Sequence, residues 1–350
     1  MKINFQGGFA VSKNDSCKAK KEINPRLNAV GGQAVIEGVM MKHKDSYAIT
    51  VRKEDGSLVT DSYKFSSVRK KNKLFNIPLV RGFVNFIVMM ILSYGTLNKA
   101  TEMLGIMDEE ETKFEKWLKK RFGASIVNFI MIISVVFALV LAGGLFILLP
   151  TATGGFINGF IELGWARSLV EGLVRVVILV AYLFLVSLIP DMKRVFQYHG
   201  AEHKSVFCYE SGKDLTVENV RTFKRFHPRC GTSFLFVLII VSVVVSMFIP
   251  FQETWLRTLS KLLVSPIIIG LGYEFLMYAG KHDNALVRFL TAPGLWMQRI
   301  TTKEPDDSML EVAIISLKKA MPDEFPEEIE KSHSENGNTV TNEQNLAENA

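Results

Sequence analysis

Four apolar runs, each close to the length of a membrane-spanning helix, dominate this chain of 350 residues. A helix needs about 20 predominantly apolar residues to cross a bilayer, because the hydrocarbon layer is about 30 Å thick. A proline follows each of the first three runs, and Pro266 is expected to kink the fourth. We therefore predict a mainly α-helical, polytopic membrane protein whose transmembrane bundle occupies residues 123–300. Its four spans are predicted at residues 124–149, 168–189, 233–249 and 262–280.

A fifth apolar stretch, residues 74–97, is a poorer span because Pro78, Arg81 and Asn85 interrupt it. If it crossed the membrane while the later spans kept their places, the many basic residues of 1–73 would be exported, against the positive-inside rule. We predict instead an interfacial or re-entrant helix, followed by a charged helix that ends near residue 122.

The loops between the runs differ in charge, and this difference predicts the orientation. The loop 150–167 holds one basic residue and the loop 250–261 holds two. The loop 191–232 holds eight, namely Lys193, Arg194, Lys204, Lys213, Arg221, Lys224, Arg225 and Arg229. Because Lys and Arg gather in cytoplasmic loops, we predict that this loop and both termini lie on the cytoplasmic side of the membrane. The net charge of +6 is then explained by Lys and Arg in cytoplasmic loops, next to an anionic membrane surface. No nucleic-acid partner is therefore expected.

Residues 29–73 are predicted to form a small cytoplasmic β element. Its first part, residues 29–41, combines β-branched residues with glycine, which favours one strand entered through Gly31 and Gly32. A turn explains these two glycines better than a close approach of the backbone to a ligand. Glu37 lies in this apolar stretch, so its carboxylate needs a partner. Two further strands, on either side of the hairpin signal Asp55-Gly56, are predicted at residues 46–52 and 58–65.

The chain after the bundle is predicted to end in an interfacial segment, a helix and a polar tail. The interfacial segment, residues 285–300, is apolar and is broken by Pro293-Gly294. Within residues 301–320, Ser308 begins a capping box that opens a helix over residues 309–319. Disorder is predicted for both ends of the chain, the lysine-rich residues 1–28, which lack a signal peptide's apolar core, and the acidic residues 321–350.

The basic loop contains the motif with the most chemical content, His199-Gly-Ala-Glu202-His203. On a helix, His203 would lie about 40° to one side of His199 and Glu202 about 60° to the other, so all three share one face. This H-x-x-E-H pattern is the inverted form of a zinc-peptidase motif, in which two His bind zinc and the Glu acts on the metal-bound water. The alternative is that the histidines contact lipid headgroups.

Further candidate ligands flank the membrane on the predicted cytoplasmic side. His227 and Cys230 precede the third span, and His282 follows the fourth. Glu274 lies inside the fourth span, where an ionisable side chain is costly, so it is a third ligand, the ion-pair partner of Arg81 or a protonated carboxyl group. Imidazole, carboxylate and thiolate ligands favour zinc. The three cysteines show no disulfide pattern, and Cys208 would lie nearly opposite His203, where it packs.

The chain resembles the bacterial YqhQ family of multi-pass membrane proteins over about residues 30–320. The resemblance rests on the stretches GGQAVIEGVMM, YHGAEHK, LTVENV, HPRCGTSF, APGLWMQRITT and EPDDSMLEVA. That family is of unknown function and is commonly described as a predicted metal-dependent enzyme. The resemblance implies candidate ligands or catalytic groups at five matching positions, His199, Glu202, His203, His227 and Cys230.

Three functional hypotheses follow. The leading one is a zinc-dependent hydrolase at the cytoplasmic membrane surface, with a lipid or membrane-associated substrate. In it, His199 and His203 bind the metal, Glu202 is the general base, and His227, Cys230, His282 or Glu274 completes the shell. The second is a non-catalytic membrane scaffold or assembly factor with a structural metal or His cluster. The third is a transporter, which is less favoured because no inverted repeat is visible. The oligomeric state stays open.

Overall fold

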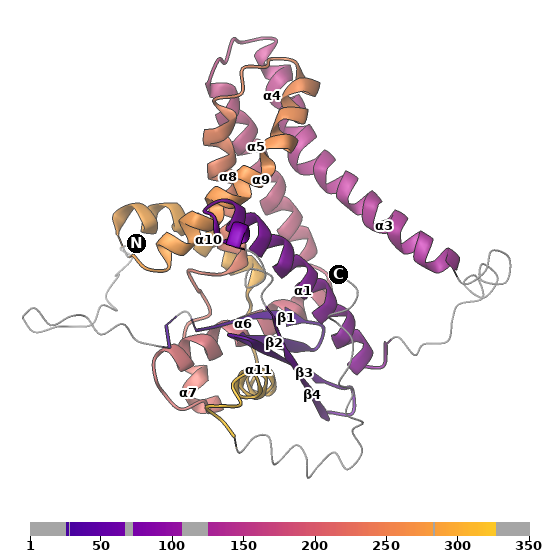
Figure 1. Cartoon of the computed structure of the whole chain (residues 1–350), viewed down its shortest axis with the longest axis vertical. Helices are drawn as coiled ribbons and strands as arrows, with labels where there is room; N and C mark the ends of the chain where they lie inside the picture. Colours follow the sequence, from indigo (N-terminus) through magenta and orange to yellow (C-terminus); the bar gives the residue numbers. More distant parts are fainter. Residues whose placement is uncertain (1–25, 28, 67–72, 107–124, 283, 327–350) are drawn as a thin grey trace, which may run out of the picture.

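A membrane-type helical bundle and a smaller α/β unit make up the two ends of the molecule (Figure 1). The computed structural model describes residues 26–27, 29–66, 73–106, 125–282 and 284–326. The bundle at the upper end contains α4 (Leu149–Asn158), α5 (Ala166–Val186), α8 (Gly231–Ser246) and α9 (Thr254–Ala279). At the lower end, α6 (Pro190–Glu210), α7 (Val217–Arg221) and α11 (Asp307–Lys319) pack with a β-sheet. The prediction of a mainly α-helical membrane protein with a small N-terminal β element is confirmed.

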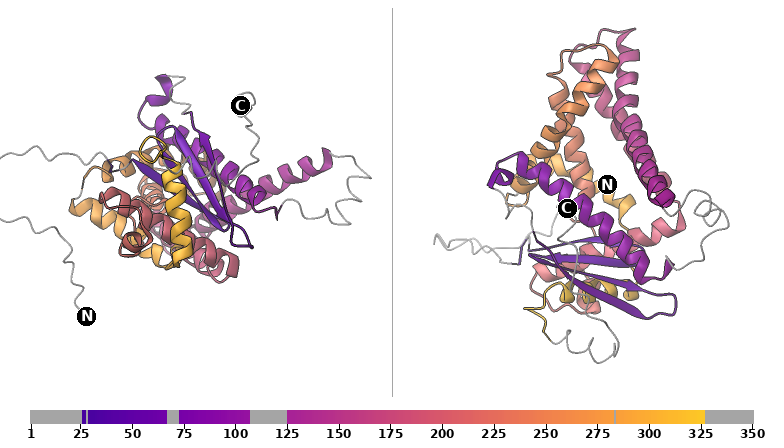
Figure 2. Two further views of the ribbon diagram at one scale, coloured as in Figure 1. Left: turned by 90° about the horizontal axis from the view of Figure 1, so that it is seen from below. Right: turned by 45° about the vertical axis from the view of Figure 1, so that its right-hand side comes forward.

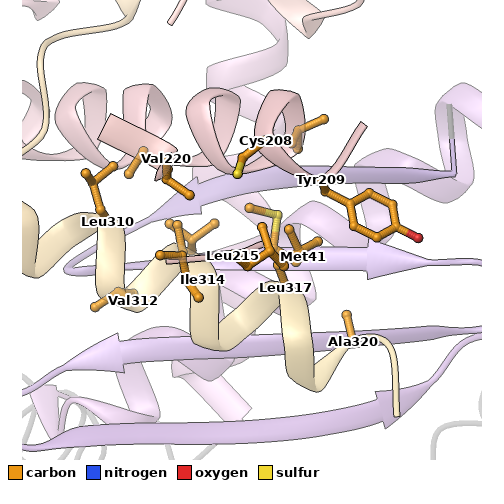
Figure 3. Close-up of a cluster of buried hydrophobic side chains, with 14 of the residues drawn as sticks. Met41, Cys208, Tyr209, Leu215, Val220, Leu310, Val312, Ile314, Leu317 and Ala320 are labelled. Carbon is orange, nitrogen blue, oxygen red and sulfur yellow. The ribbon is translucent and has the colours of Figure 1, made fainter. Parts of the chain in front are cut away.

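The sheet is antiparallel and has the strand order β1-β2-β3-β4. Its strands are β1 (Val30–Val35), β2 (Gly38–His43), β3 (Ser46–Arg52) and β4 (Leu58–Lys64). The hairpin predicted around Asp55-Gly56 is confirmed, and Gly56 has the positive φ of 84° that the turn requires. One face of the sheet packs against α6 and α11, which together bury the core shown in Figure 3. Met41 of β2, Tyr209 of α6 and Leu317 of α11 meet there.

The prediction of one strand over residues 29–41 is wrong, because this stretch is a β-hairpin. β1 and β2 pair from Val30↔His43 to Val35↔Gly38, and Glu37 occupies the turn with a positive φ of 48°. The hairpin carries Glu37 to the first turns of α6, where its carboxylate forms an ion pair with Arg194. Arg194 is therefore the partner that the carboxylate in this apolar stretch needed.

Four helices are long and apolar enough to cross a membrane, by length and composition. They cover Val80–Met103, Ile133–Asn158, Ala166–Val186 and Thr254–Ala279, while Gly231–Ser246 is a shorter apolar helix. This set differs from the predicted four, since it includes α1 (Val80–Met103), which was predicted to be interfacial. α1 nevertheless lies obliquely: Gly82 packs on Gly270 of α9, and Ala100 is buried against the sheet. α1 is one continuous helix, and its interfacial or re-entrant placement stays a prediction.

The first predicted span does not end at Pro150. α3 (Ser125–Gly143) continues through a π-helical turn (Gly144–Leu148) directly into α4. Pro150 has no N–H to donate to the carbonyl of Phe146, and the wider π turn accommodates the proline ring. Arg175 of α5 donates its Nε hydrogen to that carbonyl at 2.8 Å. At its N-terminal end, α3 runs away from the other bundle helices (Figure 2).

The end of the chain also differs in detail from the prediction. α10 (Ala285–Thr301) is one continuous helix that contains Pro293, so the predicted break there is wrong. α11 is capped by Asp306 and not by Ser308, because the Asp306 carboxylate accepts the N–H of Met309. Met321 is buried in the core beside α11, so order extends further than predicted. The disorder predicted for the ends of the chain otherwise falls outside the described residues, as does most of the charged helix predicted before residue 122.

Candidate metal centre

The motif residues lie in the middle of α6, so this part of the predicted connection between two spans is helical. Pro190 stands at the first helical position, where a missing N–H costs nothing, and Asp191 adds a negative charge to the first turn. The helix crosses below the bundle and packs on the sheet beside α11 (Figure 1). Its spacing places His199, Glu202 and His203 on one face, as the sequence predicted.

His199, His203 and Cys230 form a compact group of metal-ligand atoms. One nitrogen from each ring and the Cys230 sulfur all lie within 4.8 Å of one another. His199 Nε2 is 3.3 Å from Cys230 Sγ. Zinc bonds of about 2.0 Å to nitrogen and about 2.3 Å to sulfur, at a tetrahedral angle, separate such ligands by about 3.5 Å. The distance from His199 Nε2 to Cys230 Sγ is close to this separation, and the third donor atom lies within 4.8 Å of both.

Backbone carbonyls fix the orientation of both imidazoles. His199 Nδ1 lies 2.8 Å from the carbonyl oxygen of Thr301, and His203 Nδ1 lies 2.5 Å from that of Arg225. A carbonyl only accepts hydrogen bonds, so each Nδ1 carries the proton and each Nε2 keeps its lone pair. This is the arrangement by which proteins orient histidine ligands toward a metal.

The Glu202 carboxylate faces both imidazoles from inside the protein. Its Oε2 is 3.8 Å from Nε2 of His199 and 3.8 Å from Nε2 of His203. Burial raises the pKa of Glu202, while the His199 ring and the backbone N–H of Gly32 act in the opposite direction. Glu202 thus lies beside the position between the two Nε2 atoms, where it can hold a proton or a metal-bound water.

Gly32 lies in β1 and packs against Glu202, so the predicted turn at Gly31 and Gly32 is wrong. A Cβ on Gly32 would come within 2.7 Å of Glu202 Cγ and 2.8 Å of the Met40 carbonyl oxygen. A Cβ on Gly31 would meet nothing within 4 Å. Only a glycine at position 32 lets the strand approach α6 closely enough for its N–H to reach the carboxylate.

These neighbouring glycines provide a matched pair of variants. Gly32→Ala is expected to displace Glu202 and to destabilise the protein by about 1–3 kcal/mol, the usual effect of overpacking a filled core. Gly31→Ala adds the same methyl group in open space and is expected to change little. Thermal unfolding of the two purified variants checks the difference. Equal melting temperatures would show that β1 does not fix Glu202.

Cys230 reaches the site as the N-cap residue of α8. The segment before it is held by Gln298 of α10, which is fully buried. The Gln298 side chain accepts the N–H of His227 at 2.7 Å and donates to the His227 carbonyl at 2.7 Å. α10 therefore fixes the position of the segment from His227 to Cys230.

His227 is buried beside the centre but is not part of the ligand group. Its ring packs against His203 and Phe207, at centroid distances of 5.5 and 4.6 Å. Its nitrogens face Arg229 and the carboxylate of Glu210. Burial lowers the pKa of His227 to about 4, so the ring is neutral at physiological pH. His227 therefore packs against the His203 ring and contributes no atom to the ligand group.

The structure does not bring Glu274 or His282 to this group. Glu274 forms a bidentate ion pair with Arg81 of α1, with Arg81 Nε 2.6 Å from Oε1. This is the ion-pair alternative of the sequence analysis. His282 is exposed, stacks on Tyr278 at a centroid distance of 4.2 Å, and lies outside the cluster of His199, His203 and Cys230.

Several residues that hold the site were missed by the sequence analysis. Gly32, Arg225, Gln298 and Thr301 act through the backbone or through one buried amide, and none carries a recognisable ligand pattern. A signal was present for three of them, because Gly32 lies in the stretch GGQAVIEGVMM and Gln298 and Thr301 lie in APGLWMQRITT, both of which carry the family resemblance. Those stretches suggested importance but no role.

Comparison with known proteins gives two matches that include the site. A family model described as "Protein of unknown function (DUF1385)" matches residues 77–323. "Uncharacterized protein YqhQ" of Bacillus subtilis (strain 168) is 36% identical over 298 residues, which are 84% of this chain and 92% of that protein. No solved structure matches. All three clustered ligands and Glu202 fall inside the matched region.

Proposed function

The chain belongs to the DUF1385 family, whose function is unknown, and we propose from its site that it is a zinc-dependent hydrolase of the membrane surface. The observation that carries this proposal is the group of His199, His203 and Cys230 with both Nδ1 atoms bonded to carbonyls. Three protein ligands leave a fourth tetrahedral position for water, as in catalytic zinc sites.

Each residue of the centre has a separate role in this proposal. His199 and His203 offer Nε2, and Cys230 offers its thiolate, to one metal ion. Zinc held here would supply a Lewis acid and would lower the pKa of a coordinated water toward 7. Glu202, whose Oε2 lies 3.8 Å from both Nε2 atoms, would accept a proton from the attacking water and return it to the leaving group.

The position of the centre favours a substrate at the membrane surface. Cys230 directly precedes α8, and α6 follows the apolar helix α5 after three residues. The headgroup of a lipid or of a membrane-associated molecule lies at this surface, next to the centre. A water-soluble substrate does not need a centre in this position. We propose that this surface is the cytoplasmic one, since residues 191–232 carry eight basic residues.

This orientation makes a testable prediction. A cysteine introduced at Ser211, which is exposed at the end of α6, is expected to react with a membrane-impermeant maleimide only after the cells are opened. An exposed position in the opposite loop, Glu162→Cys, is the control and is expected to react in intact cells. Labelling of the Ser211 variant in intact cells would reverse the orientation.

The metal itself is the direct test of the proposal. We expect about one zinc per chain in the purified protein, measured by elemental analysis, because three donors of suitable type lie within 4.8 Å of one another. His199→Ala, His203→Ala and Cys230→Ser are each expected to lose most of it. His282→Ala and His227→Ala remove imidazoles outside the group and are expected to keep it, which controls for any loss of a histidine. Wild-type protein without metal contradicts the hydrolase.

A structural metal in a membrane scaffold is the second candidate, and one observation favours it. Glu202, His203 and Cys230 are each less than a tenth exposed, which is typical of closed structural sites. A cavity of about 390 Å³ lies elsewhere, and its lining includes Arg26, His43 and Tyr209 but none of the clustered ligands. In this case Glu202 would be the fourth ligand, and Glu202→Gln would lower the zinc content.

A further inference from the structure

α10 exposes an apolar stripe although it lies outside the bundle. Leu286, Phe289 and Trp296 are 61, 76 and 54% exposed. Phe289 and Trp296 are seven residues apart, so they lie within about 20° of each other on the helix surface. The opposite face, with Val287 and Gly294, is buried against α8. The stripe therefore points away from the protein.

Two arginines border this stripe on one side. Arg288 and Arg299 are both exposed and are eleven residues apart, which again corresponds to about 20°. Arg288 is one residue before Phe289, about 100° around the helix. An apolar stripe with cations along one edge is typical of helices that lie in the interface of an anionic membrane.

The chain connections place α10 at a membrane surface. α9, one of the helices long enough to span, ends at Ala279, and α10 begins at Ala285. Gly294 of α10 packs on Ser233 in the first turn of α8, with room for no Cβ. Figure 1 shows α10 lying crosswise to α8 at its lower end. Where α9 crosses the membrane, the exposed stripe lies level with the headgroup region at the end of α9.

The same helix holds both parts of the metal centre. The carbonyl of Thr301 binds His199 Nδ1, and Gln298, one turn earlier, fixes the segment that ends in Cys230. A displacement of α10 would therefore move a histidine ligand and the cysteine ligand relative to His203, whose own anchor is Arg225.

We propose that α10 binds the headgroups of anionic phospholipids through Arg288 and Arg299, and that this contact holds the metal centre in place. The occupant is the lipid of the same bilayer, because the stripe, the charges and the chain connections all meet at its surface. The first part stands on α10 alone, and the second rests on the proposed zinc site.

Quenching of Trp296 fluorescence tests whether α10 binds anionic lipid headgroups. The protein is reconstituted in phosphatidylcholine nanodiscs that contain either brominated phosphatidylglycerol or brominated phosphatidylcholine, both of which quench tryptophan. The Trp296 signal is taken as the difference between wild type and Trp296→Phe. We expect stronger quenching by the anionic lipid, with a preference that falls about fivefold for each arginine removed in Arg288→Gln and Arg299→Gln.

The matched control is the double variant Lys213→Gln/Lys224→Gln, which removes two exposed charges of the same sign far from α10 in sequence. It is expected to leave the preference unchanged. Equal quenching by the two lipids overturns the proposal. So does an absence of quenching by either lipid together with dimer formation that Trp296→Phe abolishes, which would mean that a second copy covers the stripe.

Zinc release to a chelator tests the second part. Release is expected to be several-fold slower in discs with phosphatidylglycerol than in phosphatidylcholine alone, and Arg288→Gln/Arg299→Gln is expected to remove this difference. Equal release from the two kinds of disc overturns the coupling while the zinc site stands. Protein without zinc overturns the proposed function and the coupling, and Trp296 quenching then still decides whether α10 binds anionic lipid.

Discussion

Glu202→Gln is expected to abolish function while the protein folds, enters the membrane and keeps its zinc. The two side chains have nearly the same shape, and the three ligand residues are untouched. A glutamine cannot take up a proton, and loss of a general base typically slows a reaction by 10²- to 10⁴-fold. The measurement is complementation of a deletion strain, with protein level, melting temperature and zinc content determined on the same membranes.

The control is Glu218→Gln, which removes an exposed carboxylate from α7 in the same region. It is expected to complement fully. Full complementation by Glu202→Gln would end the hydrolase proposal even with zinc present. Loss of zinc in Glu202→Gln would instead identify Glu202 as a fourth ligand and support the scaffold.

Glu171→Gln is expected to lower the stability of the bundle by about 3–5 kcal/mol, because it leaves buried cations without their anion. Glu171 of α5 is 1% exposed. Its Oε1 accepts from Arg167 Nε at 3.1 Å and from Arg257 Nε at 2.9 Å, and its other oxygen pairs with Lys261. Lys261 also donates to the hydroxyl of Thr151 at 2.9 Å, so one carboxylate connects α4, α5 and α9.

Thermal unfolding of the detergent-solubilised protein checks this expectation. Glu162→Gln removes an exposed carboxylate just before α5 and should change nothing. The double variant Glu171→Gln/Lys261→Met should lose less than the sum of its single variants, since it removes both members of one buried pair. If Glu171→Gln melted like Glu162→Gln, the carboxylate would not hold the three helices together.

This network also shows where sequence patterns fail. Glu171 and Arg175 are four residues apart on α5, a spacing that is compatible with an ion pair. In the structure, Arg175 donates its hydrogen bonds to the Phe146 carbonyl and to Ser242, while Glu171 pairs with the residue four before it, Arg167, and with α9. Arg167 and Arg175 are both four residues from Glu171, so the spacing allowed either pair. The packing of α4 and α9 against α5 selected Arg167.

Local features of the chain were determined by the sequence alone. Apolar runs of about 20 residues predicted helices long and apolar enough to cross a membrane, because the hydrocarbon layer is about 30 Å thick. The Asp55-Gly56 hairpin follows from turn geometry. The shared face of His199, Glu202 and His203 follows from the helical repeat once α6 is a helix. In each case the determining interactions lie within a few residues.

The set of residues in the candidate metal centre was decided by tertiary structure. His227 and Cys230 are three residues apart and were equal candidates for the ligand group. Two hydrogen bonds from Gln298 fix the backbone of His227, and with the backbone in this position Cys230 faces His199. Glu274 pairs with Arg81 of α1, 193 residues away in sequence. Gly32 supports Glu202 from a strand 170 positions earlier. Such contacts depend on where whole helices and strands dock, and that packing has no signature in the spacing of residues along the chain.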